Sequence, residues 1–351
     1  MINVGNSYRR RIFISRNKKD LSFLKLRVEN KIYEIEKNHT DYEQLSSFES
    51  EDFSKNISVF IFKKNIVEVI DKLVSGMTDL KFQSELIILK NDVYKILVAD
   101  FKTIKEYIKN LIDNDSLLIH RGVSKDKSNE FIKYQEEFEN LYTALLSTPQ
   151  DIKRGFFDLF DDVNVCPYCN RNFVNPINKE TRVDKDIKNQ SPDIEHFYPK
   201  SIYPLLSLSI SNLLPSCAFC NKIKSNFDTY DNFKSPYEIE DDDFKFKFDS
   251  LEVGKRTVKL NTKLNNSKVL HLENLYANVH SQYVNEIYSE INKYPKENRE
   301  YLNKFFALPF DTQEKLYKKK FCNYYKDSDF NKQSLSKMTK DLFLQIKEDE
   351  D

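Results

Sequence analysis

Four of the five cysteines form two pairs with the same spacing, Cys166 with Cys169 and Cys217 with Cys220. Each pair has the C-x-x-C pattern, and the 47 residues 170–216 separate the pairs. Such a turn presents two thiolates together, and two turns complete the tetrahedral coordination that Zn²⁺ adopts in structural sites. Two equal spacings fit unrelated buried thiols poorly, so we predict a structural zinc. Because four thiolates leave no open coordination position, these cysteines should stabilise the fold and take no direct part in catalysis.

A histidine preceded by two acidic residues lies between the cysteine pairs. His196 follows Glu195 directly, and Asp193 stands two positions before Glu195. An imidazole can be neutral near pH 7 and accept a proton from water, and carboxylates bind hard divalent cations. Together these groups suit phosphodiester hydrolysis, in which a cation neutralises phosphate charge and the base produces hydroxide. An isolated acid–histidine pair also fits an ordinary surface histidine, but its position between the cysteine pairs favours the catalytic interpretation.

The joint pattern of residues 166–224 resembles the HNH, or ββα-metal, endonuclease family in its form with two C-x-x-C pairs. That pattern is an acid–histidine pair, a proline, an Asn-Leu step, and a cysteine pair followed by asparagine and lysine. The matching residues are Glu195, His196, Pro199, Asn212, Leu213, Cys217, Cys220, Asn221 and Lys224. The resemblance implies a core of two short strands and a helix, stabilised by the zinc.

The resemblance also implies roles for individual residues. His196 would be the general base that activates water. Glu195 and Asn221 would hold a catalytic Mg²⁺ or Mn²⁺. Asp193 lies two residues before Glu195, so we expect it on the same strand face, where it would be an additional ligand or a partner of the ligands. Asn212 would orient the His196 loop or ring by hydrogen bonding.

Two lysines are candidates for contact with the phosphate. Lys200 follows the proline of the motif, and Lys224 lies in the predicted helix after the second cysteine pair. A lysine on the surface of that helix fits the position of Lys224 equally well.

A longer pattern resembles the HNH subunits of Septu-type and retron-associated anti-phage systems, the PtuB-like nucleases. It comprises residues 193–200, Asp-Ile-Glu-His-Phe-Tyr-Pro-Lys, and residues 212–217, Asn-Leu-Leu-Pro-Ser-Cys. The resemblance implies a DNA substrate, with RNA possible, and an SMC-like ATPase partner of the PtuA-like kind. The alternative from a different class is a zinc-binding module for nucleic acid or protein without catalysis. The combination of Glu195, His196, Asn212 and Asn221 argues against it, because binding alone does not need them.

Composition limits the remaining possibilities. The chain has 351 residues, of which 40% are hydrophobic and 31% charged, as expected of a globular protein. Its 55 basic and 55 acidic residues give a formal net charge of zero, which is mild evidence against tight nucleic-acid binding by the chain alone. We expect no membrane-spanning segment and a cytoplasmic protein. The fifth cysteine, Cys322, is expected in the core.

Hydrophobic periodicity predicts the elements around this centre. Helices are expected over residues 20–45, 93–112, 271–293, 297–322 and 333–346, and a strand or helix start leading into a helix over 58–73. Alternating Phe and Lys from Phe244 to Phe248, followed by Val258 and Leu260, predict a β-hairpin.

The expected fold class is α+β and mostly α-helical, with a central zinc-stapled ββα-metal HNH core flanked by helical regions. We expect an N-terminal helical region over residues 1–150, which is a possible docking surface for a partner. Residues 151–232 would form the zinc-bound nuclease core. A β-hairpin and helices would follow over residues 233–351.

Overall fold

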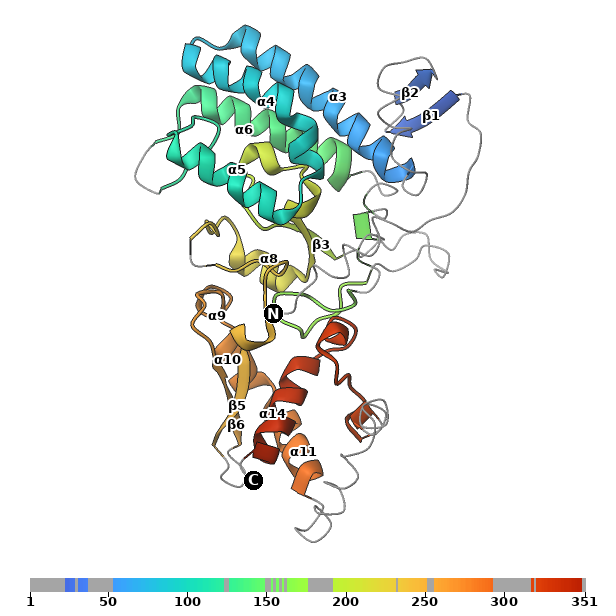
Figure 1. Cartoon of the computed structure of the whole chain (residues 1–351), viewed down its shortest axis with the longest axis vertical. Coiled ribbons are helices and arrows are strands. Elements are labelled where there is room, and N and C mark those ends of the chain that lie inside the picture. Colours follow the sequence, from blue (N-terminus) through green and yellow to red (C-terminus); the bar gives the residue numbers. More distant parts are fainter. Residues whose placement is uncertain are drawn as a thin grey trace.

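The computed structural model is an elongated molecule in which a helical region and a mixed region lie on either side of a small central unit (Figure 1). It describes residues 23–28, 31–36, 53–122, 126–148, 153, 156–157, 160, 163–175, 192–231, 233–250, 256–292, 317–318 and 320–348. Within these residues the chain is mostly helical, with three two-stranded antiparallel sheets. This agrees with the predicted α+β class.

The described part of the N-terminal region contains four helices: α3 (Phe53–Gly76), α4 (Leu80–Val98), α5 (Phe101–Asp113) and α6 (Asn129–Tyr142). Helix α6 continues into a short π-helical turn, Thr143–Ser147. The helix predicted over residues 93–112 is in fact two helices. The side chain of Asp100 accepts a hydrogen bond from the backbone N–H of Thr103 at 2.8 Å and so begins α5. Such an N-cap satisfies a donor that a continuous helix would not leave free.

The helix predicted over residues 20–45 is wrong, because this segment contains an antiparallel hairpin. Strand β1 (Phe23–Val28) pairs with β2 (Lys31–Glu36), and the register places Leu24 opposite Ile35 and Leu26 opposite Tyr33. Apolar residues at alternate positions are typical of a strand.

The central unit is a hairpin followed by a helix. Strand β3 (Asp193–His196) pairs antiparallel with β4 (Leu213–Ser216), and α8 (Ala218–Lys224) follows β4 after Cys217. Two 3₁₀ turns, Pro204–Leu206 and Ile210–Asn212, shape the connection between the strands. The predicted order of two strands and a helix is therefore present.

The C-terminal region contains the predicted hairpin and several helices. After the 3₁₀ turn Asp241–Asp243, β5 (Lys245–Ser250) pairs with β6 (Thr257–Asn261). Its helices within the described residues include α9 (Asn266–Val269), α10 (Leu272–Val279), α11 (Ser281–Asn292) and α14 (Ser336–Glu348), with a 3₁₀ turn at Asp327–Asp329.

The helix predicted over 271–293 is divided at His280. Of the helix predicted over 297–322, residues 297–316 and 319 lie outside the described residues. Cys322 is exposed and not in the core, and its φ of 52° places it in the left-handed region.

Buried apolar side chains of all three regions form one contiguous cluster, which extends from Phe62 in α3 to Leu342 in α14. The central unit therefore packs on both of its neighbours. Within the described residues, no helix is both long enough and apolar enough to cross a bilayer.

Candidate functional site

The two cysteine pairs meet in one buried cluster, as the sequence predicts. The Sγ atoms of Cys166, Cys169, Cys217 and Cys220 lie within 4.8 Å of one another, and those of Cys169 and Cys217 are 4.0 Å apart. A tetrahedral Zn²⁺ with Zn–S bonds of about 2.3 Å would separate its sulfurs by about 3.8 Å. The cluster thus fits a four-thiolate zinc site. Burial raises the pKa of the Cys166 thiol well above its ordinary value. A bound cation would stabilise the thiolate form of this buried sulfur.

The first cysteine pair is held by the C-terminal region. Asn170, which is buried and has a φ of 51°, donates from Nδ2 to the carbonyl of Phe330 at 2.8 Å. Its Oδ1 accepts from the backbone N–H of Lys337 at 3.2 Å. The hydroxyl of Tyr276, in α10, donates to the carbonyl of Cys169. Residues far apart in the sequence therefore fix the first cysteine pair.

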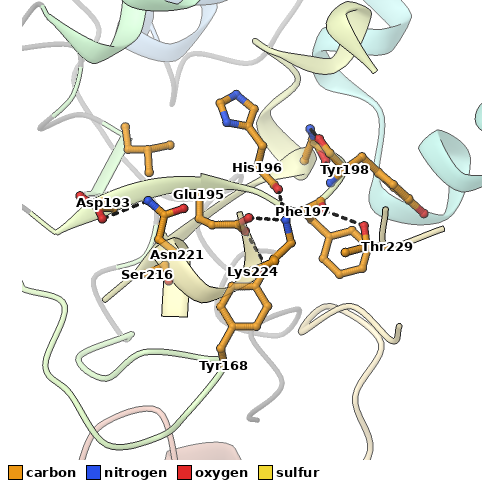
Figure 2. Close-up of polar contacts among 12 residues, drawn as sticks. Tyr168, Asp193, Glu195, His196, Phe197, Tyr198, Ser216, Asn221, Lys224 and Thr229 are labelled. Carbon is orange, nitrogen blue, oxygen red and sulfur yellow. Dashed lines mark hydrogen bonds and ion pairs between the residues drawn. The ribbon is translucent and has the colours of Figure 1, made fainter. Parts of the chain in front are cut away.

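Strand β3 presents its side chains alternately to two sides. Figure 2 shows Asp193 and Glu195 directed towards α8, whereas the imidazole of His196 points to the opposite side of the strand. This is the alternation expected of extended backbone. The structure thus brings both acidic residues together with α8, and it does not bring His196 into that group.

Glu195 belongs to a buried network of three side chains, the Tyr168–Glu195–Lys224 network (Figure 2). Glu195 Oε1 lies 2.5 Å from Lys224 Nζ, and the Tyr168 hydroxyl donates to Glu195 Oε2 at 2.6 Å. The exposed fractions of the Lys224 and Glu195 side chains are 0% and 2%. Burial raises the pKa of Tyr168 well above its ordinary value, so this residue is a neutral donor. Lys224, one of the phosphate candidates, is therefore directed inward.

Asp193 and Asn221 form a second polar pair. Asn221 Nδ2 donates to Asp193 Oδ2 at 3.0 Å, and both side chains are partly exposed. Asn221 is in α8 and Asp193 is the first residue of β3, so the pair joins the helix to the strand. A carboxylate and an amide are oxygen donors of the kind that Mg²⁺ and Mn²⁺ prefer.

His196 is buried in a setting that keeps its ring neutral. Nε2 lies 2.9 Å from the carbonyl oxygen of Ser207, and the ring packs edge-on against Tyr142 with centroids 4.5 Å apart. Because a carbonyl only accepts, Nε2 must carry the proton, which leaves the lone pair on Nδ1. Within the described residues Nδ1 has no hydrogen bond. Burial is the main cause that lowers the pKa of His196 to about 3, so its ring is a neutral base at pH 7.

Asn212 positions the chain that follows His196. Its Oδ1 accepts from the N–H of Tyr198 at 2.8 Å, and its Nδ2 donates to the carbonyls of Tyr198 and Leu206 at 3.1 Å. Phe197 N–H donates to the Asn212 carbonyl at 2.8 Å. Asn212 therefore holds the loop after His196. It does not contact the imidazole ring in these bonds, and the ring is instead oriented by the carbonyl of Ser207.

The N-terminal helices support the same loop. Ser209 Oγ and Ser211 Oγ donate to the carbonyls of Ile96 and Ala99, at the end of α4. The other phosphate candidate, Lys200, is partly exposed and lies 3.6 Å from Glu139 in α6. Its ammonium is thus on the His196 side of the centre, over the ring of Tyr142 at 5.2 Å.

Comparison with known proteins gives a partial match. The chain is similar to Septu protein PtuB of Bacillus thuringiensis. The identity is 34% over 108 residues, which are 31% of this chain and 35% of that protein. The matched part thus spans about a third of the relative's length. No protein-family model matches the chain, and no solved structure gives a significant match.

Three residues in contact with Glu195 or His196 were not predicted from the sequence. Tyr168 stands inside the first cysteine pair, where its spacing gives no sign of a contact with Glu195. Ser207 acts through its backbone carbonyl, which every residue type has. Tyr142 lies before the first cysteine pair, and its packing on His196 depends on the tertiary fold.

Proposed function

We propose that this chain is an endonuclease that hydrolyses phosphodiester bonds with His196 as the general base. The observation that carries the proposal is the state of that imidazole. Ser207 fixes the proton on Nε2, which leaves the lone pair of Nδ1 to take a proton from water. The setting on a strand hairpin followed by a helix, beside four clustered cysteines, supports an HNH-type centre.

The other residues of the centre position this base. Asn212 holds the loop that follows His196, and the cysteine cluster, when it binds zinc, joins the first cysteine pair to the start of α8. Lys200, whose ammonium lies over the ring of Tyr142 on the His196 side, would be the lysine that meets a phosphate. A catalytic Mg²⁺ or Mn²⁺ held between β3 and Asn221 would neutralise charge on the phosphate.

The chain would act as the nuclease of an anti-phage complex. The support is the partial similarity to Septu protein PtuB. The formal net charge of zero also fits a nuclease whose affinity for nucleic acid comes partly from another subunit. We propose that the partner is an SMC-like ATPase of the PtuA-like kind and that the substrate is DNA.

A cleavage assay tests the proposal. The zinc-loaded chain is incubated with plasmid, linear DNA and RNA in Mg²⁺ or Mn²⁺, alone and with an SMC-like ATPase of the PtuA-like kind. We expect DNA cleavage that His196→Ala reduces at least 100-fold, which is within the range usual for loss of a general base. Lys222→Met is the matched control, because Lys222 is exposed in α8.

Three outcomes would contradict parts of the proposal. Cleavage that survives in His196→Ala would refute the role of the base. Cleavage of RNA alone would make the chain a ribonuclease. Binding without cleavage under every condition, including with the ATPase, would make it a zinc-binding module.

A further inference from the structure

We propose that Glu195 is a positioning residue and not a ligand of the catalytic cation, which is held instead by Asp193 and Asn221. This inference rests on the proposed function, because it assigns residues within the same centre. The basis is the different surroundings of the two carboxylates of β3.

Both oxygens of the Glu195 carboxylate already have short contacts inside the protein. The Lys224 ammonium forms an ion pair with Oε1 at 2.5 Å, and the Tyr168 hydroxyl donates a hydrogen bond to Oε2 at 2.6 Å. A cation at this carboxylate would have to lie beside the Lys224 ammonium, which is fully buried and cannot move into solvent without opening α8. Two positive charges in one buried place repel strongly. Glu195 therefore suits an ion pair better than a cation site.

The Asp193 carboxylate, in contrast, has no contact with a buried ammonium among the described residues and is partly exposed. Its partner is the uncharged amide of Asn221, which donates to Asp193 Oδ2 at 3.0 Å and is also partly exposed. Rotation of the amide by half a turn would present the oxygen of Asn221 beside the carboxylate. Two protein oxygens with water and substrate phosphate in the other positions are a usual coordination for Mg²⁺.

The Tyr168–Glu195–Lys224 network has a positioning task of its own. Lys224 Nζ also donates to the backbone carbonyl of His196 at 2.8 Å, so the ammonium joins α8 to the residue that carries the base. Tyr168 lies between Cys166 and Cys169. Through Glu195, the network therefore connects the first cysteine pair to the carbonyl of His196.

Manganese binding in the absence of nucleic acid tests the assignment. Mn²⁺ is titrated into the zinc-loaded chain and followed by electron paramagnetic resonance, with zinc content and circular dichroism measured on every variant. We expect Asp193→Asn and Asn221→Ala to weaken Mn²⁺ binding at least 10-fold. The double variant Glu195→Gln with Lys224→Met removes both buried charges together, and its Mn²⁺ affinity should stay within 3-fold of the wild type.

The results separate this inference from the nuclease function. A folded, zinc-containing double variant that loses Mn²⁺ binding, or a wild-type chain that binds no Mn²⁺, would overturn the assignment. A chain that binds Mn²⁺ through Asp193 but cleaves neither DNA nor RNA would refute the function and leave the assignment intact.

The positioning task has a kinetic test. In the double variant, kcat for DNA cleavage should fall about 10-fold with KM unchanged, because the backbone of His196 loses its donor while substrate contacts remain. An unchanged kcat in the double variant would show that Glu195 has a purely structural role.

Discussion

Removal of the Lys224 ammonium alone should destabilise the protein far more than removal of both charges of the buried pair. Lys224→Met leaves the Glu195 carboxylate buried, at 2% exposure, with Tyr168 as its remaining partner. A buried ion that loses its partner destabilises a protein by about 3–5 kcal/mol. The double variant with Glu195→Gln removes that unpaired charge. Its expected cost is about 1–3 kcal/mol, for the His196 carbonyl that loses its donor.

Urea unfolding of the zinc-loaded chain, followed by circular dichroism, measures these differences. Lys222→Met is the matched control, because Lys222 is exposed two positions earlier in the same helix, and its effect should stay within about 0.5 kcal/mol. The coupling free energy between the two positions should be about 2 kcal/mol or more. The reasoning fails if Lys224→Met costs no more than Lys222→Met, or if the double variant is no more stable than Lys224→Met.

Three further predictions concern other parts of the centre. The pKa of His196 is lowered to about 3 in the folded protein and lies near 6.5 in the unfolded chain. Between these pH values the unfolded state binds more protons, so the stability of the fold decreases as the pH is lowered. From pH 7.5 to pH 5.0 the wild type should lose about 2 kcal/mol more than His196→Gln in urea unfolding, and equal losses would refute the buried neutral ring. Cys217→Ser should lower the bound zinc well below one ion per chain by metal analysis, whereas Cys322→Ser, outside the cluster, should leave it unchanged. Asn170→Ala should destabilise the chain by about 1 kcal/mol more than Asn170→Gly in the same unfolding assay. Both variants lose the side-chain hydrogen bonds, but only alanine is strained at a φ of 51°. Equal losses of stability would contradict this.

The sequence predicted the local parts of the centre because their signals are local. Two C-x-x-C turns and a four-thiolate zinc site impose one geometry, so Cys166 and Cys217 could be placed together without a structure. The acid–histidine pair and the cysteine pair similarly located a strand pair and a helix. The alternating apolar and lysine residues after Phe244 located the β5–β6 hairpin.

The sequence could not show which groups meet across the fold. Alternation along β3 places Glu195 and His196 on opposite sides, yet only the tertiary structure reveals that Lys224 turns inward to Glu195. The break between α4 and α5 depended on whether Asp100 would cap a helix or lie on its exposed face. In the β1–β2 segment, the apolar residues recur at every second position, which is the period of a strand and not of the predicted helix.

The way Asn170 is held has a consequence for the order of events during synthesis. The groups that bond its side chain, the carbonyl of Phe330 and the N–H of Lys337, lie 160 and 167 residues further along the chain. While the ribosome is still making the C-terminal region, Cys166 and Cys169 can bind zinc, but the turn that carries them lacks these bonds. Contacts between such distant residues form late and slowly in folding. The completed centre therefore requires α14, so a nascent or truncated chain should carry the cysteines and His196 without the geometry proposed for catalysis.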